Sequence, residues 1–283
     1  MSVKKPRTAR AVSANQGVQK EYAARLRKVL ALVIREALSE IKADFARAGM
    51  AQDAANTPPD TSIQDYINGR FTENMARWLV HATQRAKDVS RWYCREVYRT
   101  TTNAQKKALI AAGMSKKAID MRWGIPVLKR QYISPTAAKN LESDIQANTE
   151  LITKMAAQDL ERLQSLMNES AKRNVNFSDI ESVLKASEGF DEARAKRVAL
   201  DQTNKLNQQI QRNNAKDLGI TKFIWVHIPG KYTSRHTHIA MNGKTFEADK
   251  GLWDEDVEDF VLPGELPYCR CQSRMILPEE LFE

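Results

Sequence analysis

The chain carries two cysteines one residue apart, Cys269 and Cys271, in the stretch CRCQSRMIL. Two histidines, His236 and His238, repeat this spacing in HTHIAM. In a strand, side chains two positions apart share a face, with Cα atoms about 6.6 Å apart. Two thiols and two imidazoles form a donor set for tetrahedral Zn²⁺. One hypothesis is therefore a His₂Cys₂ zinc site, and no other cofactor is expected.

A simpler interpretation gives the thiols no ligand. The C-x-C spacing departs from the C-x₂₋₄-C spacing of ordinary structural zinc sites, whereas small buried thiols pack well on one face of a strand. The inward-facing residues would then be Cys269, Cys271, Ser273, Met275 and Leu277. Arg270 and Arg274 would point outward or pair with the acidic stretch Glu247–Phe260. We expect packing, and keep zinc as the alternative.

Catalysis is a third hypothesis. A nucleophilic cysteine paired with His238 needs electropositive surroundings that lower the thiol pKa, and Arg235 and Arg270 are the cations nearby in the sequence. An ADP-ribosyltransferase-like reaction would need an arginine for the dinucleotide phosphates and a catalytic glutamate. Arg235 fits the first role, but no glutamate is identified for the second. The alternative function is thus a metal-dependent or thiol-dependent hydrolase or transferase. We predict no catalytic residue and no enzyme.

The net charge of +9 indicates an anionic partner or surface. The basic residues gather at the N-terminus, where residues 1–18 are expected to form a flexible arm. The nucleic-acid-binding candidates in this arm are Lys4, Lys5, Arg7 and Arg10. Such a cluster binds phosphates in a salt-sensitive, sequence-independent way. A solubilising tail, or a segment that orders only against another protein, is the competing interpretation.

The composition is that of a globular protein, with 42% hydrophobic and 28% charged residues. No apolar run approaches the roughly 20 residues that cross a membrane, so no membrane partner is expected. The N-terminus, MSVKKPRTARAVSANQ, lacks the apolar segment of a secretory signal. The 3 cysteines cannot form a closed disulfide set, which favours a reducing compartment.

Apolar residues recur every three or four positions through the first half of the chain, which predicts long helices. We expect helices over about 19–49 and 62–112 and from Pro135 onward, with breaks near Gly69, Ser90 and Asn148. A hinge or short extended passage should follow Gly113. Ser134 is suited to cap the helix that begins at Pro135.

Further along, the pattern changes from helix to strand. Asp191 is suited to cap a helix over Glu192–Leu218, which Gly219 would end. Lys222–Ile228 is β-branched and aromatic and predicts a strand. Asn242-Gly243 predicts a tight turn. The fold class is therefore α+β. An elongated helical region, 19–175, precedes a small α/β domain with short antiparallel strands, 176–283.

Several elements of this C-terminal part occur together in an order that is specific. They are Asp201, Gln202, Lys205, Leu206 and Asn207 in a helix, Gly219-Ile220 before the FIW strand, Arg235 and His238, Gly243-Lys244 with Phe246, and Cys269-Arg270-Cys271. In this order they resemble the Mu F-like minor head proteins of tailed bacteriophages, also called phage head morphogenesis proteins. The resemblance covers about Arg197–Leu277. One departure is GKYTSR, which lacks the acidic residue usual shortly before the arginine.

The resemblance implies a minor capsid protein without catalytic activity. Such a protein joins the procapsid at or near the portal vertex, where its partners are the portal protein, the major capsid protein or both, and it contacts the packaged DNA. It is expected in the virion head, and in the host cytoplasm during assembly. The motif residues would then be structural. Arg235 and His238 would staple a hairpin, and the polar helix residues would bond to the sheet, with Gln202 reaching its backbone.

Overall fold

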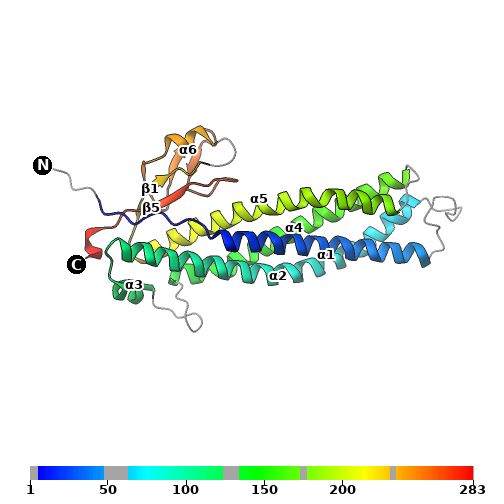
Figure 1. Ribbon diagram of the computed structural model, residues 1–283, viewed down its shortest axis with the longest axis horizontal. Coiled ribbons are helices and arrows are strands. Elements are labelled where there is room, and N and C mark those ends of the chain that lie inside the picture. The colour runs from blue at the N-terminus through cyan, green and yellow to red at the C-terminus, as the bar shows by residue number, and fades with distance from the viewer. Residues whose placement is uncertain (1–5, 48–62, 124–133, 173–176, 230–233, 283) are drawn as a thin grey trace. The chain divides into compact units, whose positions relative to one another are not determined.

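The computed structural model describes residues 6–47, 63–123, 134–172, 177–229 and 234–282 (Figure 1). Long helices are followed by short antiparallel strands, which confirms the predicted α+β class. The helices are α1 (Gln16–Arg47), α2 (Ile63–Ala111), α3 (Lys116–Trp123), α4 (Pro135–Lys172), α5 (Phe177–Asp217) and α6 (His236–Ala240), with a 3₁₀ turn at Glu279–Leu281. The strands are β1 (Lys222–Val226), β2 (Thr245–Glu247), β3 (Leu252–Asp254), β4 (Asp259–Val261) and β5 (Gln272–Met275).

The chain forms two compact units, each built from segments far apart in the sequence. The first, here called the mixed unit, comprises Met1–Glu21, Trp92–Asp144 and Arg197–Glu283. The second, the helical unit, comprises Tyr22–Arg91 and Ile145–Lys196. The sequence analysis instead divided the chain into continuous parts, 1–18, 19–175 and 176–283. Helical periodicity shows which face of a helix is buried, but it does not show which neighbour covers that face.

The helical unit buries apolar side chains that recur at helical spacing. They include Tyr22, Leu26, Val33 and Ile41 of α1, Phe71 and Trp78 of α2, and Ile152, Leu160 and Met167 of α4. A polar group inside this core is fully paired, because Asn148 donates to the Tyr22 hydroxyl at 2.7 Å and accepts from Ser90 Oγ at 2.9 Å. The helices therefore continue through Ser90 and Asn148, where breaks were expected.

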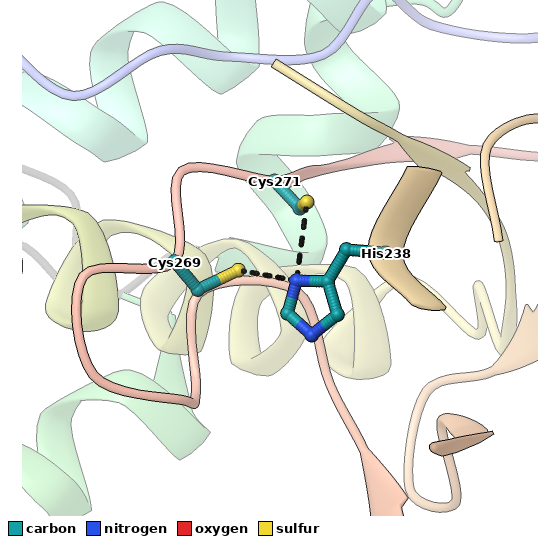
Figure 2. Close-up of side chains that lie close together, drawn as sticks. All are labelled: His238, Cys269 and Cys271. Atoms are coloured by element: carbon teal, nitrogen blue, oxygen red, sulfur yellow. Dashed lines mark hydrogen bonds between the residues drawn. The ribbon is translucent and has the colours of Figure 1, made fainter. Parts of the chain in front are cut away.

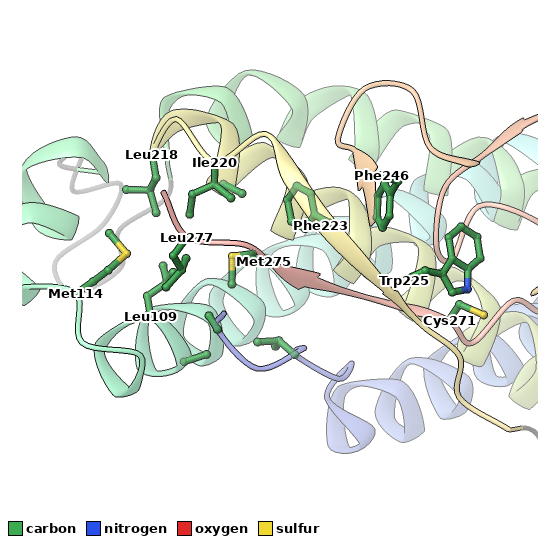
Figure 3. Close-up of a cluster of buried hydrophobic side chains, with 14 of the residues drawn as sticks. Leu109, Met114, Leu218, Ile220, Phe223, Trp225, Phe246, Cys271, Met275 and Leu277 are labelled. Carbon is green, nitrogen blue, oxygen red and sulfur yellow. The ribbon is translucent and has the colours of Figure 1, made fainter. Parts of the chain in front are cut away.

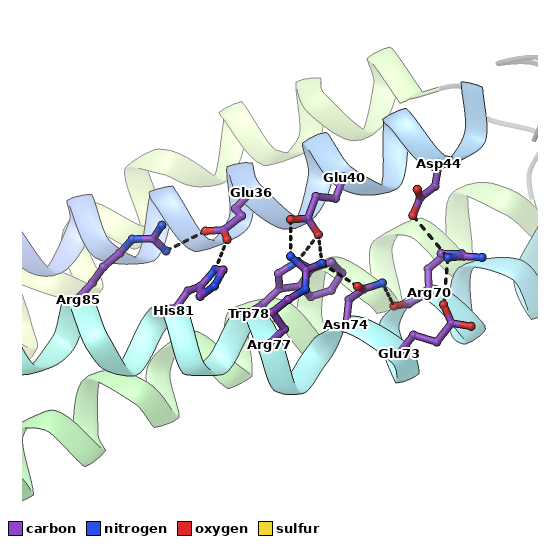
Figure 4. A network of polar contacts seen from close by, with 10 residues as sticks. All are labelled: Glu36, Glu40, Asp44, Arg70, Glu73, Asn74, Arg77, Trp78, His81 and Arg85. Carbon is purple, nitrogen blue, oxygen red and sulfur yellow. Dashed lines mark hydrogen bonds and ion pairs between the residues drawn. The ribbon is translucent and has the colours of Figure 1, made fainter. Parts of the chain in front are cut away.

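A row of polar contacts joins the facing sides of α1 and α2 in the helical unit (Figure 4). The contacts are Glu36 with His81 and Arg85, Glu40 with Arg77 and Trp78, and Asp44 with Arg70. Glu40 accepts from Arg77 at 2.9 Å and from the indole nitrogen of Trp78 at 2.8 Å. Oppositely charged groups in register select which faces of the two helices meet, although each exposed pair adds little stability.

A three-stranded antiparallel sheet, in the order β2-β1-β5, organises the mixed unit. Trp225 of β1 lies opposite Ser273 of β5. β3 and β4 form a second, two-stranded sheet. Helix α5 leads into β1 through Gly219, whose φ of +75° is the left-handed conformation that commonly ends helices. The predicted strand and the predicted helix stop are both confirmed here.

The sheet packs its aromatic residues against the ends of α2 and α5 (Figure 3). Phe223 and Phe246 stack with ring centroids 5.7 Å apart, and Trp225 meets Phe246 edge to face at 6.0 Å. Other buried residues of this cluster are Leu109, Met114, Leu218, Ile220, Met275 and Leu277. This core fixes β1 and β5, and therefore the loop that enters β5.

Residues 6–15 lie along β5. Ala9 donates its N–H to the carbonyl of Met275 at 3.1 Å, and Leu277 donates to the carbonyl of Arg7 at 2.9 Å. Ala9 is fully buried. The sequence analysis expected a flexible arm here, because basic residues dominate the segment. Two apolar residues of this segment, Ala9 and Val12, are buried in the core of the mixed unit.

Three elements differ from the sequence-based expectation. Helix α3 occupies part of the passage expected to be a hinge, and it buries Ile119 and Trp123. Helix α5 runs unbroken past Asp191. The segment HTHIA forms helix α6 rather than an extended strand. Helices α3 and α6 have only 8 and 5 residues, and tertiary packing commonly decides the structure of such short segments.

Candidate metal centre

Cys269, Cys271 and His238 converge inside the mixed unit (Figure 2). Their ligand atoms all lie within 4.8 Å of one another. The Nδ1 atom of His238 is 3.4 Å from the Cys269 sulfur and 3.7 Å from the Cys271 sulfur. All three residues are buried, with at most 4% of their surface exposed. The sequence analysis named these residues, and the structure brings them together.

The backbone around Cys269 is held by helix α5. The preceding residue, Tyr268, has a φ of +60°, which is uncommon for a residue with a side chain. Asp201 accepts the Tyr268 N–H at 2.6 Å, and Asn204 donates to the Cys269 carbonyl at 2.5 Å. Gly264 donates its N–H to the Cys269 sulfur at 3.4 Å. These bonds fix both the position and the direction of the first thiol.

Helix α5 also bonds to β5 through buried amides. Gln208 accepts the N–H of Ser273 at 2.9 Å. Asn207 accepts from Gln211 at 2.6 Å and donates to Thr101 of α2 at 2.9 Å. The polar residues of α5 therefore form hydrogen bonds within the mixed unit itself. Gln202, expected to reach the sheet, instead donates to Asp201 at 3.1 Å, and Gln208 makes the contact with the strand.

A buried carboxylate orients His238. The Nε2 atom lies 3.2 Å from Oδ2 of Asp254, an ion-pair distance, although the alignment falls outside that of a hydrogen bond. Asp254 is fully buried and also accepts from Thr237 at 3.2 Å and from the N–H of Asp256 at 3.0 Å. The carboxylate and the two thiols therefore lie at opposite nitrogens of the His238 ring.

The two thiols have opposed acidities. A hydrogen bond from Cys271 lowers the pKa of Cys269, and bonds from His238 and the Gly264 N–H act in the same direction against the effect of burial. The same bond to Cys269, together with burial, raises the pKa of Cys271. Of the two thiols, Cys269 is therefore the more acidic. A thiolate beside an oriented imidazole is suited to bind a soft metal ion.

His236 lies outside this cluster. Its side chain is 79% exposed, and its Nε2 is 3.6 Å from Asp256. The proposed pairing of His236 with His238 assumed an extended segment. On helix α6, residues two apart face nearly opposite sides, so only one of the pair can face the thiols.

His227 takes the place expected for His236. Its Nδ1 is 3.6 Å from the Cys271 sulfur, and its backbone N–H donates to the Asn242 side chain at 2.9 Å. The sequence reasoning missed this residue. The signal was present, because His227 continues the alternation of Phe223 and Trp225, the two buried residues of β1.

The remaining motif residues surround the cluster. Lys205 pairs with Asp201 at 3.1 Å, and Arg235 donates to the carbonyl of Pro267 at 3.1 Å. Gly243, with a φ of +83°, makes the predicted turn, and Arg270 is exposed.

The basic candidates of the arm lie apart from these residues in the sequence. Lys4 and Lys5 fall outside the described residues. Arg7 and Arg10 are exposed. The guanidinium of Arg7 lies 4.4 Å from the ring centre of Phe282, a cation–π contact.

Comparison with known proteins gives a family for the part of the chain that holds the cluster. The family model described as Phage Mu protein F like protein matches residues 161–274. An uncharacterized protein of Haemophilus influenzae is 26% identical over 144 residues, which are 51% of this chain and 31% of that relative. The chain therefore spans about a third of the length of the curated relative it matches. No solved structure matches.

In the described parts of the chain, no helix combines the length and the apolar character needed to cross a membrane. The matched range contains His227, His238, Cys269 and Cys271, together with the helix α5 residues that hold them. The motif order found in the sequence and the match of the family model agree. Residues 161–274 are thus similar to the Mu F-like phage head morphogenesis proteins, as the motif order predicted.

Proposed function

We propose that this protein is a minor capsid protein that attaches at the portal vertex while a phage head assembles. The family match over residues 161–274 carries this proposal. The mechanism is binding rather than catalysis. The cysteine–histidine cluster is almost completely buried, so a substrate has no access to its thiols in this conformation. That burial favours a structural role for the cluster over the hydrolase or transferase alternative.

The amphipathic N-terminal helices are the first candidates for docking on portal or major capsid subunits, through their apolar stripes. Their apolar residues, however, largely fill the core of the helical unit. The sheet of β3 and β4 presents a different surface. Trp253 and Phe260 are 51% and 42% exposed and meet edge to face, with ring centroids 5.4 Å apart. The neighbouring Val257 is 43% exposed.

Acidic residues border this aromatic pair. They are Glu255, Asp256, Glu258 and Asp259. An aromatic centre with a charged rim is typical of protein interfaces, whereas the negative charge repels the phosphates of DNA. We therefore assign this surface, the β3–β4 face, to a protein partner, and we take that partner to be the portal protein with basic residues around its docking site.

The basic N-terminal segment is the proposed contact with packaged DNA. Arg7 and Arg10 are exposed on it, and Lys4 and Lys5 precede them. Replacing Arg10 with Gln should weaken binding to DNA of any sequence and reduce the salt dependence of affinity by about one unit of slope. Fluorescence anisotropy over a salt series measures both quantities. An unchanged slope would remove Arg10 from the DNA contact.

The experiment for head attachment is assembly of procapsids from portal, scaffold and major capsid proteins with this protein present. Wild-type protein should copurify with the particles, and the Trp253→Ala/Phe260→Ala double variant should be lost from them. Val80→Ala, a substitution of a 65% exposed residue in the helical unit, is the matched control and should copurify normally. Absence of the wild-type protein from particles would refute the function. Normal incorporation of the double variant would refute only the β3–β4 face.

A further inference from the structure

We propose that the mixed unit binds one structural Zn²⁺ ion through the sulfurs of Cys269 and Cys271 and the Nδ1 atoms of His238 and His227. The proposal concerns the stability of the fold. It does not depend on how the protein attaches to a phage head.

The distances fit a tetrahedral ion. With Zn–S bonds of about 2.3 Å and Zn–N bonds of about 2.0–2.1 Å, a sulfur and a nitrogen on the same ion lie about 3.6 Å apart. Three of the four sulfur–nitrogen pairs lie 3.4, 3.6 and 3.7 Å apart. The ligand atoms of His238, Cys269 and Cys271 all lie within 4.8 Å of one another, and His227, which approaches Cys271, would complete the site as the fourth ligand. Two thiolates with two imidazoles are also a common ligand set of structural zinc.

Hydrogen bonding alone does not account for this arrangement. A ring nitrogen takes part in one strong hydrogen bond, as donor or as acceptor. His238 Nδ1, however, lies within contact distance of two sulfurs, and the Cys271 sulfur lies within contact distance of two ring nitrogens. At any one time, protons can therefore bridge only some of these sulfur–nitrogen contacts. A cation at the centre satisfies every one of them together.

The groups behind the ligands are those that a zinc site requires. A histidine that binds zinc through one nitrogen usually presents the other to a carboxylate, and His238 presents Nε2 to the buried Asp254 at 3.2 Å. The Gly264 N–H points at the Cys269 sulfur. Among the described residues, the buried indole nitrogen of Trp225 has no hydrogen-bond partner. An N–H donor directed at a sulfur stabilises its thiolate form.

The charges also balance. Binding of Zn²⁺ displaces the two thiol protons, so two thiolates and one dication give a neutral centre. Without an ion, burial of two thiolates would be costly. The ion would also join three separate segments: the end of β1, helix α6 and the loop before β5. A sheet of short strands gains stability from such a crosslink.

The test begins with the full-length protein, expressed with zinc in the medium and purified without chelator. Elemental analysis should find about one zinc ion per chain. Replacement by Co²⁺ should give the visible absorption of a tetrahedral centre and thiolate-to-cobalt charge transfer. Metal removal by a chelator should lower the melting temperature, and added Zn²⁺ should restore it. Less than about 0.1 zinc per chain in folded protein that also gives no cobalt spectrum would overturn the proposal.

Matched variants test the ligands. Cys271→Ser and His227→Ala should each lower zinc affinity at least tenfold, measured by competition with a chromophoric chelator. His236→Ala and Cys94→Ser are the controls, since His236 is exposed and Cys94 is buried in helix α2 outside the cluster. Both should keep wild-type affinity. Loss of zinc in His236→Ala with retention in His227→Ala would overturn the assignment of the fourth ligand. A disulfide between the two thiols in the purified protein would overturn the site.

Discussion

The two units of this protein hold their polar groups in different ways. In the helical unit, the ion pairs of α1 and α2 lie near the surface, with Arg77 47% and Glu40 33% exposed. In the mixed unit, amides of α5 lie inside, and Gln208 and Gln211 are fully buried. Water can replace a lost partner at the surface but not in a core. Stability should therefore be spread over many residues in the helical unit and concentrated in a few in the mixed unit.

The strongest test of this difference is a cavity in the mixed unit. Trp225→Ala removes a fully buried indole that packs on Phe246 and His238. We expect a loss of about 3–5 kcal/mol in the free energy of unfolding. Chemical denaturation measures it. Trp253→Ala, which changes an exposed tryptophan of the same unit, should stay within about 0.5 kcal/mol. Equal losses would mean that burial does not set the cost.

A buried amide gives the next largest effect. Gln208→Leu leaves the Ser273 N–H without its acceptor, and such an unpaired buried group costs about 1–3 kcal/mol. The matched control is Gln146→Leu, because the exposed side chain of Gln146 donates to Glu150, one turn away on the same helix. The control should change the free energy of unfolding by less than about 0.5 kcal/mol. Comparable losses in the two variants would contradict the expectation that the stability of the mixed unit depends on a few buried residues.

The helical unit should tolerate loss of an ion pair. Arg77→Leu removes the contacts with Glu40, and exposed pairs of this kind contribute about 0.2–1 kcal/mol. Urea denaturation of the wild type and the variant gives the difference. A loss above about 2 kcal/mol would show that this unit also depends on single polar contacts.

The smallest expected effect is on the stability of the protein at acidic pH. Hydrogen bonds from Arg77 lower the pKa of Glu40 below its usual value of 4.5, with Trp78 contributing in the same direction. A carboxylate whose pKa is lowered by folding stabilises the fold above its unfolded pKa, and this contribution is lost as the pH falls through the folded pKa. Glu40→Gln should therefore show a shallower loss of stability than the wild type when the pH falls from about 5 to about 3. Thermal melts across this range measure the slopes, and parallel curves would contradict the expectation.

Sequence patterns predicted the helical unit better than the mixed one. The apolar spacing of α1 and α4 identified buried residues such as Leu26 and Leu160, because a long amphipathic helix repeats the same signal over many turns. The strand β1 and the stop at Gly219 were also predicted. Helix α3 was not, since its eight residues give too short a pattern to read.

The candidate site was only partly visible in the sequence. The thiol pair and His238 were identified from their spacing. His227 was missed and His236 was chosen wrongly. Two side chains that are two positions apart share a face only if the segment is extended, and the segment with His236 and His238 is helical. The oriented Asp254 could not be predicted either, as it comes from β3 and meets His238 only in the folded unit.

The pairing of residues 6–15 with β5 has a consequence for synthesis. Ser13 receives a hydrogen bond from Gln272, 259 positions later, and Ala9 meets Met275. Ala9 and Ser13 therefore cannot make these bonds until translation has passed β5. A product that stops before β5 would lack this pairing and with it a finished mixed unit.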